Sequence, residues 1–258
     1  MSSAHQALDR IRPAAAHSGA ALVGFSGGKD ALVTLDLCRQ VFDRVECYFM
    51  ELVPGLSFIE ELLDSGLRQC GSPVLHRVPH WSLQRMFQAG YYSPRIRGLE
   101  TRTIREADIL SYLRKQTGIE WIADGERMDD SIRRRWVLRK RGAVDWRFLR
   151  LHPIYDWHTR DVLEYLRIRR IHRKDTTFGH AARMTGMAML RREQLEWVRT
   201  HHPADYRRIC EFFPSMEAVH VRNRIIDATE GGGGSEAGPV QSEVHHEGSA
   251  QEVGAEPK

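Results

Sequence analysis

The sequence predicts an α/β fold built on a doubly wound, mainly parallel sheet. Short unbroken apolar runs, typical of strands buried on both faces, alternate with amphipathic segments through the first half of the chain. Two adjacent glycines, Gly27 and Gly28, join the first apolar run directly to the first amphipathic segment. Strands that alternate with helices in this way run parallel, and the helices between them cover the sheet.

The predicted elements follow this alternation in order. A short helix is expected within residues 1–17. Apolar runs predict strands at residues 20–25, 45–52, 73–79 and 119–123. Apolar residues at helical spacing predict helices within residues 32–42, 58–69, 83–88 and 104–117. From Asp129 onward we expect a helical and basic chain, which one extended piece over residues 146–151 interrupts.

The composition divides the chain into three regions. We expect an α/β domain over residues 1–158, a helical region over residues 159–229 packed on it, and a disordered tail over residues 230–258. The tail holds six Glu and one Lys, so the rest of the chain carries a net charge of +9, although the whole carries +4. A basic folded part suits a polyanionic ligand, and a nucleotide and a nucleic acid both qualify.

The same composition predicts a cytoplasmic protein without a membrane partner. No apolar run approaches the roughly 20 residues of a membrane span, and the first 20 residues lack the apolar segment of a signal peptide. The four cysteines form no CxxC pair, so we expect reduced thiols, no zinc site and no iron–sulfur cluster. The sequence does not determine an oligomeric state.

The diglycine turn has the composition of a phosphate-binding loop. In an open α/β sheet, ligands bind beyond the carboxyl ends of the strands, where the N-terminus of a helix attracts anions. Ser26, Gly27 and Gly28 can present main-chain N–H groups to phosphate oxygens, and Lys29 supplies a mobile positive charge. Asp30 can cap the helix or ligate a phosphate-bound Mg²⁺. A tight glycine turn without a ligand is the alternative interpretation.

The pattern GxxxxGK[ST] fails here, because Val23 and Asp30 occupy positions where it needs Gly and Ser or Thr. The segment instead resembles the PP-loop, SGGxDS, of the N-type ATP pyrophosphatase superfamily. Ala31 replaces the last serine of that pattern and removes one hydroxyl group. The resemblance implies a Rossmann-like fold of the adenine nucleotide alpha-hydrolase type, and ATP or a related adenylyl nucleotide with Mg²⁺ as ligands.

A second group of polar residues, DGERMDDSIRRR at residues 124–135, follows the fourth predicted strand. Arginine presents a planar fork that suits phosphate or sulfate. If a helix starts at Asp129, Ser131 and Arg134 lie within one turn of each other. A solvated basic helix is the alternative. Because this segment lies at the carboxyl end of a strand, we expect it beside the diglycine turn.

These residues resemble a motif of the phosphoadenosine phosphosulfate reductase family, GxRxxES..R, with Asp130 in place of Glu. Gly125, Arg127, Ser131 and Arg134 match the motif in order. The segment HPIYDW at residues 152–157 and the helix that follows it also resemble the family, and we interpret them as structural. In a further similar stretch at residues 178–190, Met187 and Leu190 replace the expected cysteines.

The resemblance implies roles for individual residues. Lys29, Asp30 and Arg127 are the predicted catalytic residues, and Asp30 is also the predicted metal ligand. The predicted nucleotide-binding residues are Ser26, Gly27, Gly28, Gly125, Ser131, Arg134 and Arg183. Glu51 is a candidate for a ribose or metal contact. The candidates for an adenine pocket are Trp81, Tyr91 and Tyr92, for which half-buried packing is the alternative.

Three functions remain open from the sequence. The first is cleavage or transfer at the α-phosphate of an adenylyl nucleotide, which needs no protein nucleophile. The second is reduction of a sulfonucleotide, which needs a nucleophilic thiol; Cys210 has the spacing of a core helix residue instead. The third is a module without catalysis that binds a nucleotide, a nucleic acid or a partner protein.

Overall fold

The computed structural model describes residues 3–89, 103–172 and 189–218, together with 221 and 225. Contacts group Met1–His220 into one compact unit and Val221–Lys258 into another, and the description below concerns the first. The domain boundaries expected at residues 158 and 229 stay a prediction.

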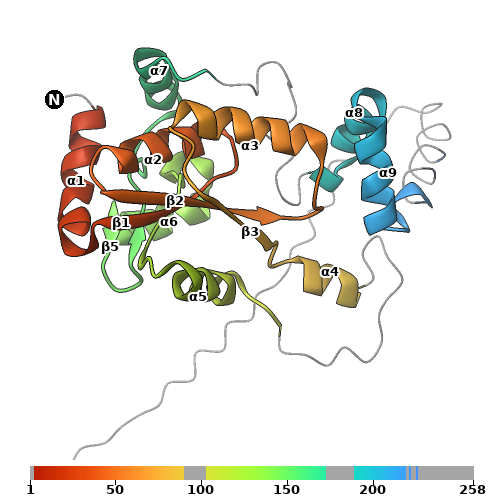
Figure 1. The fold of residues 1–258 in the computed structure, drawn as a ribbon, viewed down its shortest axis with the longest axis horizontal. Helices are drawn as coiled ribbons and strands as arrows, with labels where there is room; N and C mark the ends of the chain where they lie inside the picture. Colours follow the sequence, from red (N-terminus) through yellow and green to blue (C-terminus); the bar gives the residue numbers. More distant parts are fainter. Residues whose placement is uncertain (1–2, 90–102, 173–188, 219–220, 222–224, 226–258) are drawn as a thin grey trace, which may run out of the picture. The chain divides into compact units, whose positions relative to one another are not determined.

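A six-stranded sheet forms the centre of the described chain (Figure 1). Its strands lie in the order β3-β2-β1-β4-β6-β5, and each neighbouring pair is parallel except β5 with β6. The order reverses on the two sides of β1, as it does in doubly wound sheets. The strands are β1 Ala20–Gly24, β2 Arg44–Glu51, β3 Leu75–Pro79, β4 Trp121–Ala123, β5 Val144–Asp145 and β6 Arg150–Leu151. The predicted fold class is therefore confirmed.

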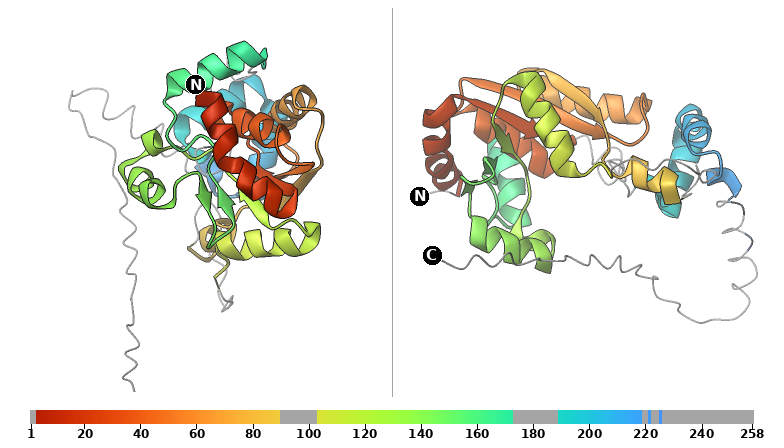
Figure 2. Two further views of the ribbon diagram at one scale, coloured as in Figure 1. Left: turned by 90° about the vertical axis from the view of Figure 1, so that its left-hand side faces the viewer. Right: turned by 90° about the horizontal axis from the view of Figure 1, so that it is seen from below.

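Helices cover both faces of this sheet, which explains why its central strands β1 and β4 are almost continuously apolar (Figures 1 and 2). Val23 belongs to a core that includes residues of α1, α2, α3 and α7, whereas Leu22 belongs to a core formed with α5. Neighbouring side chains of one strand thus enter different cores. The helices are α1 Ser3–Ser18, α2 Lys29–Arg39, α3 Ser57–Gln69, α4 Leu83–Ala89, α5 Glu106–Thr117, η1 Met128–Asp130, α6 Ile132–Arg141, α7 Thr159–Arg169, α8 Arg192–His201 and α9 Pro203–Phe212.

Two local expectations are wrong. The segment 146–151 was expected to be one extended piece, but β5 and β6 form a short antiparallel pair around a turn at residues 146–149. The helix expected from Asp129 begins only at Ile132, after the short η1. In both places hydrogen bonds within a few residues select the conformation, and apolar spacing carries little information about them.

The helices α8 and α9 are tied to the α/β part by a buried carboxylate. Asp205 on α9 accepts hydrogen bonds from the N–H and hydroxyl groups of Ser57, at 3.0 and 2.7 Å, and from the N–H of Phe58 at 3.3 Å. A carboxylate from a distant helix thus satisfies the free N–H groups at the start of α3. It also fixes α9 beside α3.

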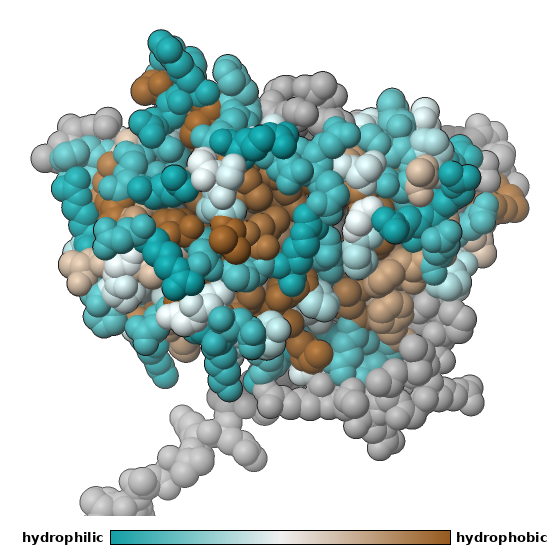
Figure 3. Space-filling model, viewed as in Figure 1, coloured by the Kyte–Doolittle hydropathy of each residue, from teal (hydrophilic) through white to brown (hydrophobic). Residues whose placement is uncertain are grey.

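Hydrophilic side chains cover most of the face shown in Figure 3, and apolar side chains show between them. Within the described part of the chain, every helix is too short or too polar to span a membrane.

Candidate functional site

The first part of the site is the turn between β1 and α2, where the two glycines meet different requirements. Gly27 has a φ of 72°, a left-handed conformation that residues with a Cβ adopt at a cost. A Cβ at this position would also lie 2.7 Å from Cγ of Leu62 on α3. Gly28 precedes α2 with an ordinary φ of −75°, and no side chain caps the helix there. The turn is therefore packed tightly against α3, and the N-terminus of α2 has no side-chain cap.

The main-chain N–H groups of this turn lack acceptors among the described residues. The N–H of Phe25 still belongs to the sheet and donates to a carbonyl of β2 at 2.8 Å. No comparable bond follows from Ser26 to Lys29, and the bonds of α2 begin with the N–H of Leu32 to the carbonyl of Gly28 at 3.0 Å. Open N–H groups at the positive end of a helix form an anion-binding site.

Two cations hold the carboxylate of Asp30 at the start of α2. Lys29 Nζ donates to Oδ2 at 2.5 Å, and Arg127 Nε lies 2.9 Å from Oδ1. The Lys29 ammonium is partly exposed, so it can leave Asp30 for a phosphate without loss of buried packing. Arg127 is only 5% exposed and is fixed in place.

The other contacts of Arg127 explain why it is fixed. One Nη group donates to Asp130 Oδ1 at 3.2 Å, and the other donates to Thr159 Oγ1 at 3.2 Å and to the carbonyl of Trp157 at 3.5 Å. Thr159 is the first residue of α7 and an acceptor for Arg127. Arg127 thus joins the two turns to α7, and a direct catalytic role for it stays a prediction.

The second part of the site is the turn after β4, which lies directly on the start of α2. A Cβ at Gly125 would lie 2.9 Å from both the carbonyl carbon and the oxygen of Asp30. Glycine is required here because the neighbouring group is backbone, which cannot rotate away. The carboxylates of Asp124 and Glu126 flank this close approach and line the cavity described below.

The side chains of Ser131 and Arg134 form hydrogen bonds and ion pairs with other groups of the protein. Ser131 precedes α6, and its Oγ accepts a hydrogen bond from the N–H of Arg134 at 3.1 Å. The Arg134 guanidinium contacts Glu126 Oε1 and Asp130 Oδ2, both at 3.2 Å. Ser131 therefore acts as a helix cap. Its predicted role toward a ligand, and that of Arg134, stay predictions.

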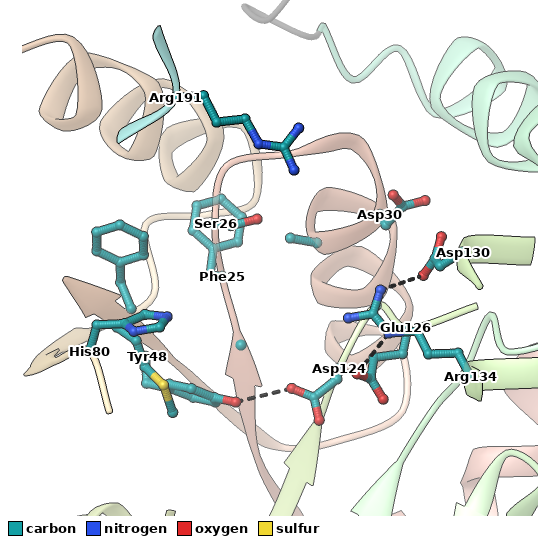
Figure 4. Close-up of a pocket in the computed structure, with 15 residues that line it drawn as sticks. Phe25, Ser26, Asp30, Tyr48, His80, Asp124, Glu126, Asp130, Arg134 and Arg191 are labelled. Carbon is teal, nitrogen blue, oxygen red and sulfur yellow. Dashed lines mark hydrogen bonds and ion pairs between the residues drawn. The ribbon is translucent and has the colours of Figure 1, made fainter. Parts of the chain in front are cut away.

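A cavity of about 1150 Å³ opens at the carboxyl ends of β1, β2 and β4 (Figure 4). Here β1 lies between β2 and β4, so the cavity coincides with the change in strand order where α/β sheets bind ligands. Its size accommodates a nucleotide. The residues that line it are Gly24, Phe25, Ser26, Asp30, Ala31, Tyr48, Phe49, Met50, His80, Asp124, Gly125, Glu126, Asp130, Arg134 and Arg191.

Sequence reasoning missed part of this lining. Arg191 precedes α8, and its guanidinium enters the cavity from above in Figure 4. Among the described residues no carboxylate forms an ion pair with it. No sequence motif near Arg191 predicted it as a site residue, because it lies far from the glycine turn in the sequence. Tyr48 and Met50 lie in β2, and His80 directly follows β3; the sequence marked them only as strand and loop residues.

The floor of the cavity is a buried charged cluster around Asp124. The hydroxyl of Tyr48 donates to Asp124 Oδ1 at 3.0 Å, and Arg150 forms an ion pair with the other oxygen. Burial, together with the adjacent carboxylate, raises the pKa of Tyr48 well above its usual value. Burial opposes the charge of Arg150, but Asp124 offsets it and holds the Arg150 pKa above its usual range. Burial lowers the pKa of His80, so this wall residue is neutral at pH 7.

Other candidate residues lie away from the cavity or outside the described residues. Glu51 accepts a hydrogen bond from Arg77 at 2.7 Å and is not part of the lining. Trp81 stacks on His80 with ring centroids 5.5 Å apart and is not part of the lining. Three predicted residues fall in parts of the chain that the structure does not describe: Tyr91, Tyr92 and Arg183.

Cys210 lies on α9, packed against the main core. Burial raises the pKa of its thiol, which disfavours the thiolate that a nucleophile requires. It is not among the cavity-lining residues. These observations agree with its interpretation as a core helix residue.

Comparison with protein families gives one match. The sequence model of the phosphoadenosine phosphosulfate reductase domain matches residues 20–175, which include both turns and all six strands. A search of curated proteins found no match in sequence.

Comparison with solved structures finds similar but distant proteins. The U34-tRNA thiolase NcsA from Methanococcus maripaludis, with its [4Fe-4S] cluster, is 13% identical with a TM-score of 0.39, covering 77% of this chain and 72% of that chain. An NH3-dependent NAD synthetase from Campylobacter jejuni, in complex with the nitrate ion, is 14% identical with a TM-score of 0.47, covering 92% of this chain and 98% of that chain. At these identities and scores the likeness carries no argument about activity.

One of these structures corrects a prediction about cofactors. An iron–sulfur cluster was not expected because paired cysteines are missing from the sequence, but NcsA contains a [4Fe-4S] cluster. The exclusion is therefore wrong as an inference for this kind of protein, since ligands that are distant in sequence can meet in the fold. Among the described residues, no three or more His, Cys, Asp or Glu side chains form a group that could hold a metal ion.

Proposed function

The chain belongs to the phosphoadenosine phosphosulfate reductase domain family, and on that premise we propose that it binds an adenylyl nucleotide in the cavity and acts at its α-phosphate. The observation that carries the proposal is the row of main-chain N–H groups from Ser26 to Lys29. They have no acceptor among the described residues and belong to a turn that forms part of the cavity wall. A nucleotide's phosphates are the ligand that such a turn fits.

The charges around the turn support the placement of the phosphates. Lys29 can exchange Asp30 for a phosphate oxygen, and Arg191 supplies a second cation that no described carboxylate neutralises. Phe25, Phe49 and Met50 are the large apolar residues of the lining, and the half-buried Met50, near the end of β2, offers surface that suits a purine base. Phosphates at the glycine turn and a base at the end of β2 give the nucleotide a single orientation.

The carboxylates support a metal ion as part of the site. Mg²⁺ in nucleotide sites takes one or two carboxylates together with phosphate oxygens. Asp30 and Asp130 line the same cavity and share Arg127, so they provide a suitable pair of donors. Lys29 and Arg127 contact the two oxygens of Asp30, so Lys29 would have to release Oδ2 for a phosphate if this carboxylate were to hold the ion. Bound Mg²⁺ would neutralise charge on the leaving pyrophosphate.

The proposed reaction is attack by an oxygen of a second substrate on the α-phosphorus of ATP. The new oxygen–phosphorus bond forms while the bond to the β-phosphate oxygen breaks, and pyrophosphate leaves with the electron pair. Lys29, Arg191 and the N–H groups of the turn would stabilise the charge that develops on pyrophosphate. The protein contributes orientation and electrostatics, and no side chain acts as nucleophile.

Thiol-dependent reduction of a sulfonucleotide is the second candidate, because the family is named for it. That reaction needs a reactive thiolate beside the nucleotide. Cys210 is packed against the core with a raised pKa, and the pKa values of the buried thiols Cys38 and Cys70 are raised to about 12 and about 11. The described thiols therefore favour adenylyl chemistry over reduction.

Binding can be tested by calorimetric titration with ATP, AMP and a sulfonucleotide in the presence of Mg²⁺. Lys29→Ala should weaken ATP binding about 10- to 100-fold, since a charge-assisted contact to phosphate is lost. Lys115→Ala, an exposed lysine on α5, is the matched control and should bind ATP normally. Equal ATP affinity in both variants would contradict the proposed phosphate site.

The position of cleavage can be tested with ATP labelled at the α-phosphate. Cleavage at that phosphate releases pyrophosphate and leaves the label on an adenylyl product, whereas cleavage at the γ-phosphate gives labelled ADP. Cys210→Ser should leave this reaction unchanged. Sulfite production from a sulfonucleotide that stops in Cys210→Ser would instead establish the reductase.

A further inference from the structure

Helix α6 is the most basic element of the described chain. Six of its ten residues are Arg or Lys, and none is acidic. Only Leu138 is buried, so the helix exposes most of its circumference. Figure 2 shows α6, in light green, standing out beside the sheet. A helix of this composition is held by few contacts of its own and presents a large surface for binding.

The helical period separates α6 into two sides. The inward side carries Leu138, with Arg134 in the cavity wall and Arg141 paired with Asp145 at 3.3 Å. At 100° per residue, the other exposed residues lie on the opposite side, with Arg135 at its edge. This side, called the outward face of α6, consists of Ile132, Arg133, Arg135, Trp136, Arg139 and Lys140.

Two large apolar side chains lie in the middle of this face. Ile132 is 85% exposed and Trp136, one turn later, is 63% exposed. The Nζ atom of Lys140 lies 4.1 Å from the centre of the Trp136 ring, a cation–π contact. The lysine therefore covers one side of the indole and leaves a flat aromatic surface between positive charges.

The arginines of this face make no ion pairs with described carboxylates, although Asp129 interacts electrostatically with Arg135 at longer range. The α6 ion pairs that the structure describes belong to Arg134 and Arg141 on the inward side. Among the described residues, no carboxylate lies within ion-pair distance of Arg133, Arg135 or Arg139. Arg135 and Arg139 lie one turn apart and repel each other, and a bound polyanion removes that repulsion.

We propose that the outward face of α6 binds a single-stranded nucleic acid. Arg133, Arg135, Arg139 and Lys140 would contact the phosphate backbone, and an unpaired base would stack on Trp136. Charge complementarity demands a polyanion, and the exposed indole selects one with free aromatic faces. A duplex keeps its bases stacked and an acidic peptide has none, so neither uses Trp136 in this way.

The position of α6 connects this surface to the cavity. Arg134 lines the cavity on the inward side, and the strand would lie on the outward face of the same helix. A nucleic acid held there lies close to the proposed nucleotide. The binding proposal is independent of the chemistry proposed above, because a chain that failed to cleave ATP would still present this face.

The test is fluorescence anisotropy of the full chain with labelled 20-nucleotide single-stranded RNA and DNA of mixed sequence, and with a duplex, at several salt concentrations. Replacing Arg133, Arg135 and Arg139 by Gln together should weaken single-strand binding at least about 10-fold at 0.1 M salt. It should also reduce the salt slope by about 2, at roughly 0.7 per phosphate contact. Trp136→Ala should weaken binding about 10-fold through lost stacking.

The matched control replaces three exposed arginines elsewhere, Arg160, Arg167 and Arg207, by Gln with the same change in net charge. An equal loss in this control would overturn the proposal, as would the absence of single-strand binding at 50 mM salt. Duplex binding as tight as single-strand binding, with Trp136→Ala silent, would also overturn it, as would equal competition by a polyglutamate peptide.

Two further measurements separate this proposal from the proposed function. The α6 triple variant should bind ATP with unchanged affinity. Lys29→Ala should bind the oligonucleotide with unchanged affinity. Loss of both ligands in the α6 variant, with normal unfolding, would place the two sites on one surface and overturn the separate assignment.

Discussion

The two turns that meet at the cavity look alike in sequence and differ in structure. Each follows a strand, contains glycine and is rich in charged residues. The turn after β1 leaves its main-chain N–H groups open at the start of α2. The turn after β4 uses its own side chains to bind several of its N–H groups: Ser131 caps α6, and Asp130 accepts the N–H of Arg127 at 3.0 Å.

This difference indicates that the two turns have different roles. The first turn offers donors to a ligand, and the second turn supports the first and supplies carboxylates to the cavity wall. Both turns need glycine, but for different reasons. Gly27 adopts a positive φ, whereas Gly125 lies too close to the backbone of Asp30 to carry a Cβ. Similar composition at two strand ends therefore does not imply similar roles.

The largest expected effect tests the supporting role of Arg127. Arg127→Met should lower the free energy of unfolding by about 3 kcal/mol, because Asp30 and Asp130 lose the buried cation between them. Arg134→Met is the control, since its ion pairs are half exposed and should cost less than about 1 kcal/mol. Urea unfolding measures both. A stable Arg127→Met that fails to bind ATP would make Arg127 a ligand contact and reverse the comparison.

The next effect separates the glycines. Gly125→Ala places a Cβ 2.9 Å from the Asp30 backbone and should destabilise the fold by about 1–3 kcal/mol. Gly28→Ala meets only Ser26 Oγ at 3.5 Å and should fold normally. If Gly28 lies against phosphate, the same variant should lose ATP affinity. Thermal unfolding and titration separate these results, and destabilisation by Gly28→Ala would show that the first turn is also built for packing.

A smaller effect concerns the histidines beside the cavity. His152 lies behind the second turn, fully buried, with Nδ1 4.0 Å from Glu126 Oε2. Burial lowers the pKa values of His152 and His80 below the usual 6.5. Below pH 6.5 the unfolded chain binds more protons than the folded chain. The free energy of unfolding should therefore decrease as the pH falls below 6.5, whereas above pH 6.5 the full contribution of the neutral rings is retained.

The measurement is the urea midpoint at pH 7.5 and pH 5.5. His152→Met should reduce the difference between the two midpoints, because the remaining chain lacks one buried titrating group. The control His201→Gln changes an exposed histidine and should leave the difference unchanged. Equal pH dependence in all three proteins would mean that the His152 ring does not contribute to it.

The smallest effect tests the departure from the PP-loop pattern. Ala31 lines the cavity at the start of α2, where the pattern has serine. Ala31→Ser should strengthen ATP binding a few-fold, the value of one additional hydrogen bond. Ala31→Val has no hydroxyl and is the control for size. Weaker ATP binding by Ala31→Ser would indicate that the nucleotide approaches the turn too closely for a hydroxyl.

Much of the fold could be predicted from the sequence, because strand and helix periods are local. The second strand was expected at residues 45–52 and runs over Arg44–Glu51. The diglycine turn and the DGERMDDS segment were expected at neighbouring strand ends, and Gly125 indeed lies against Asp30. The prediction was weaker at helix starts, as at Ile132, where a single side-chain hydrogen bond sets the boundary.

The sequence by itself determined the order of the elements and the position of the glycine turn, because apolar period and glycine content act over a few residues. The tertiary structure alone decided that Asp205 caps α3, that Arg191 enters the cavity and that Arg127 is held by α7. These contacts join residues far apart in the chain. They form only when packed helices bring the partners together, so no local pattern encodes them.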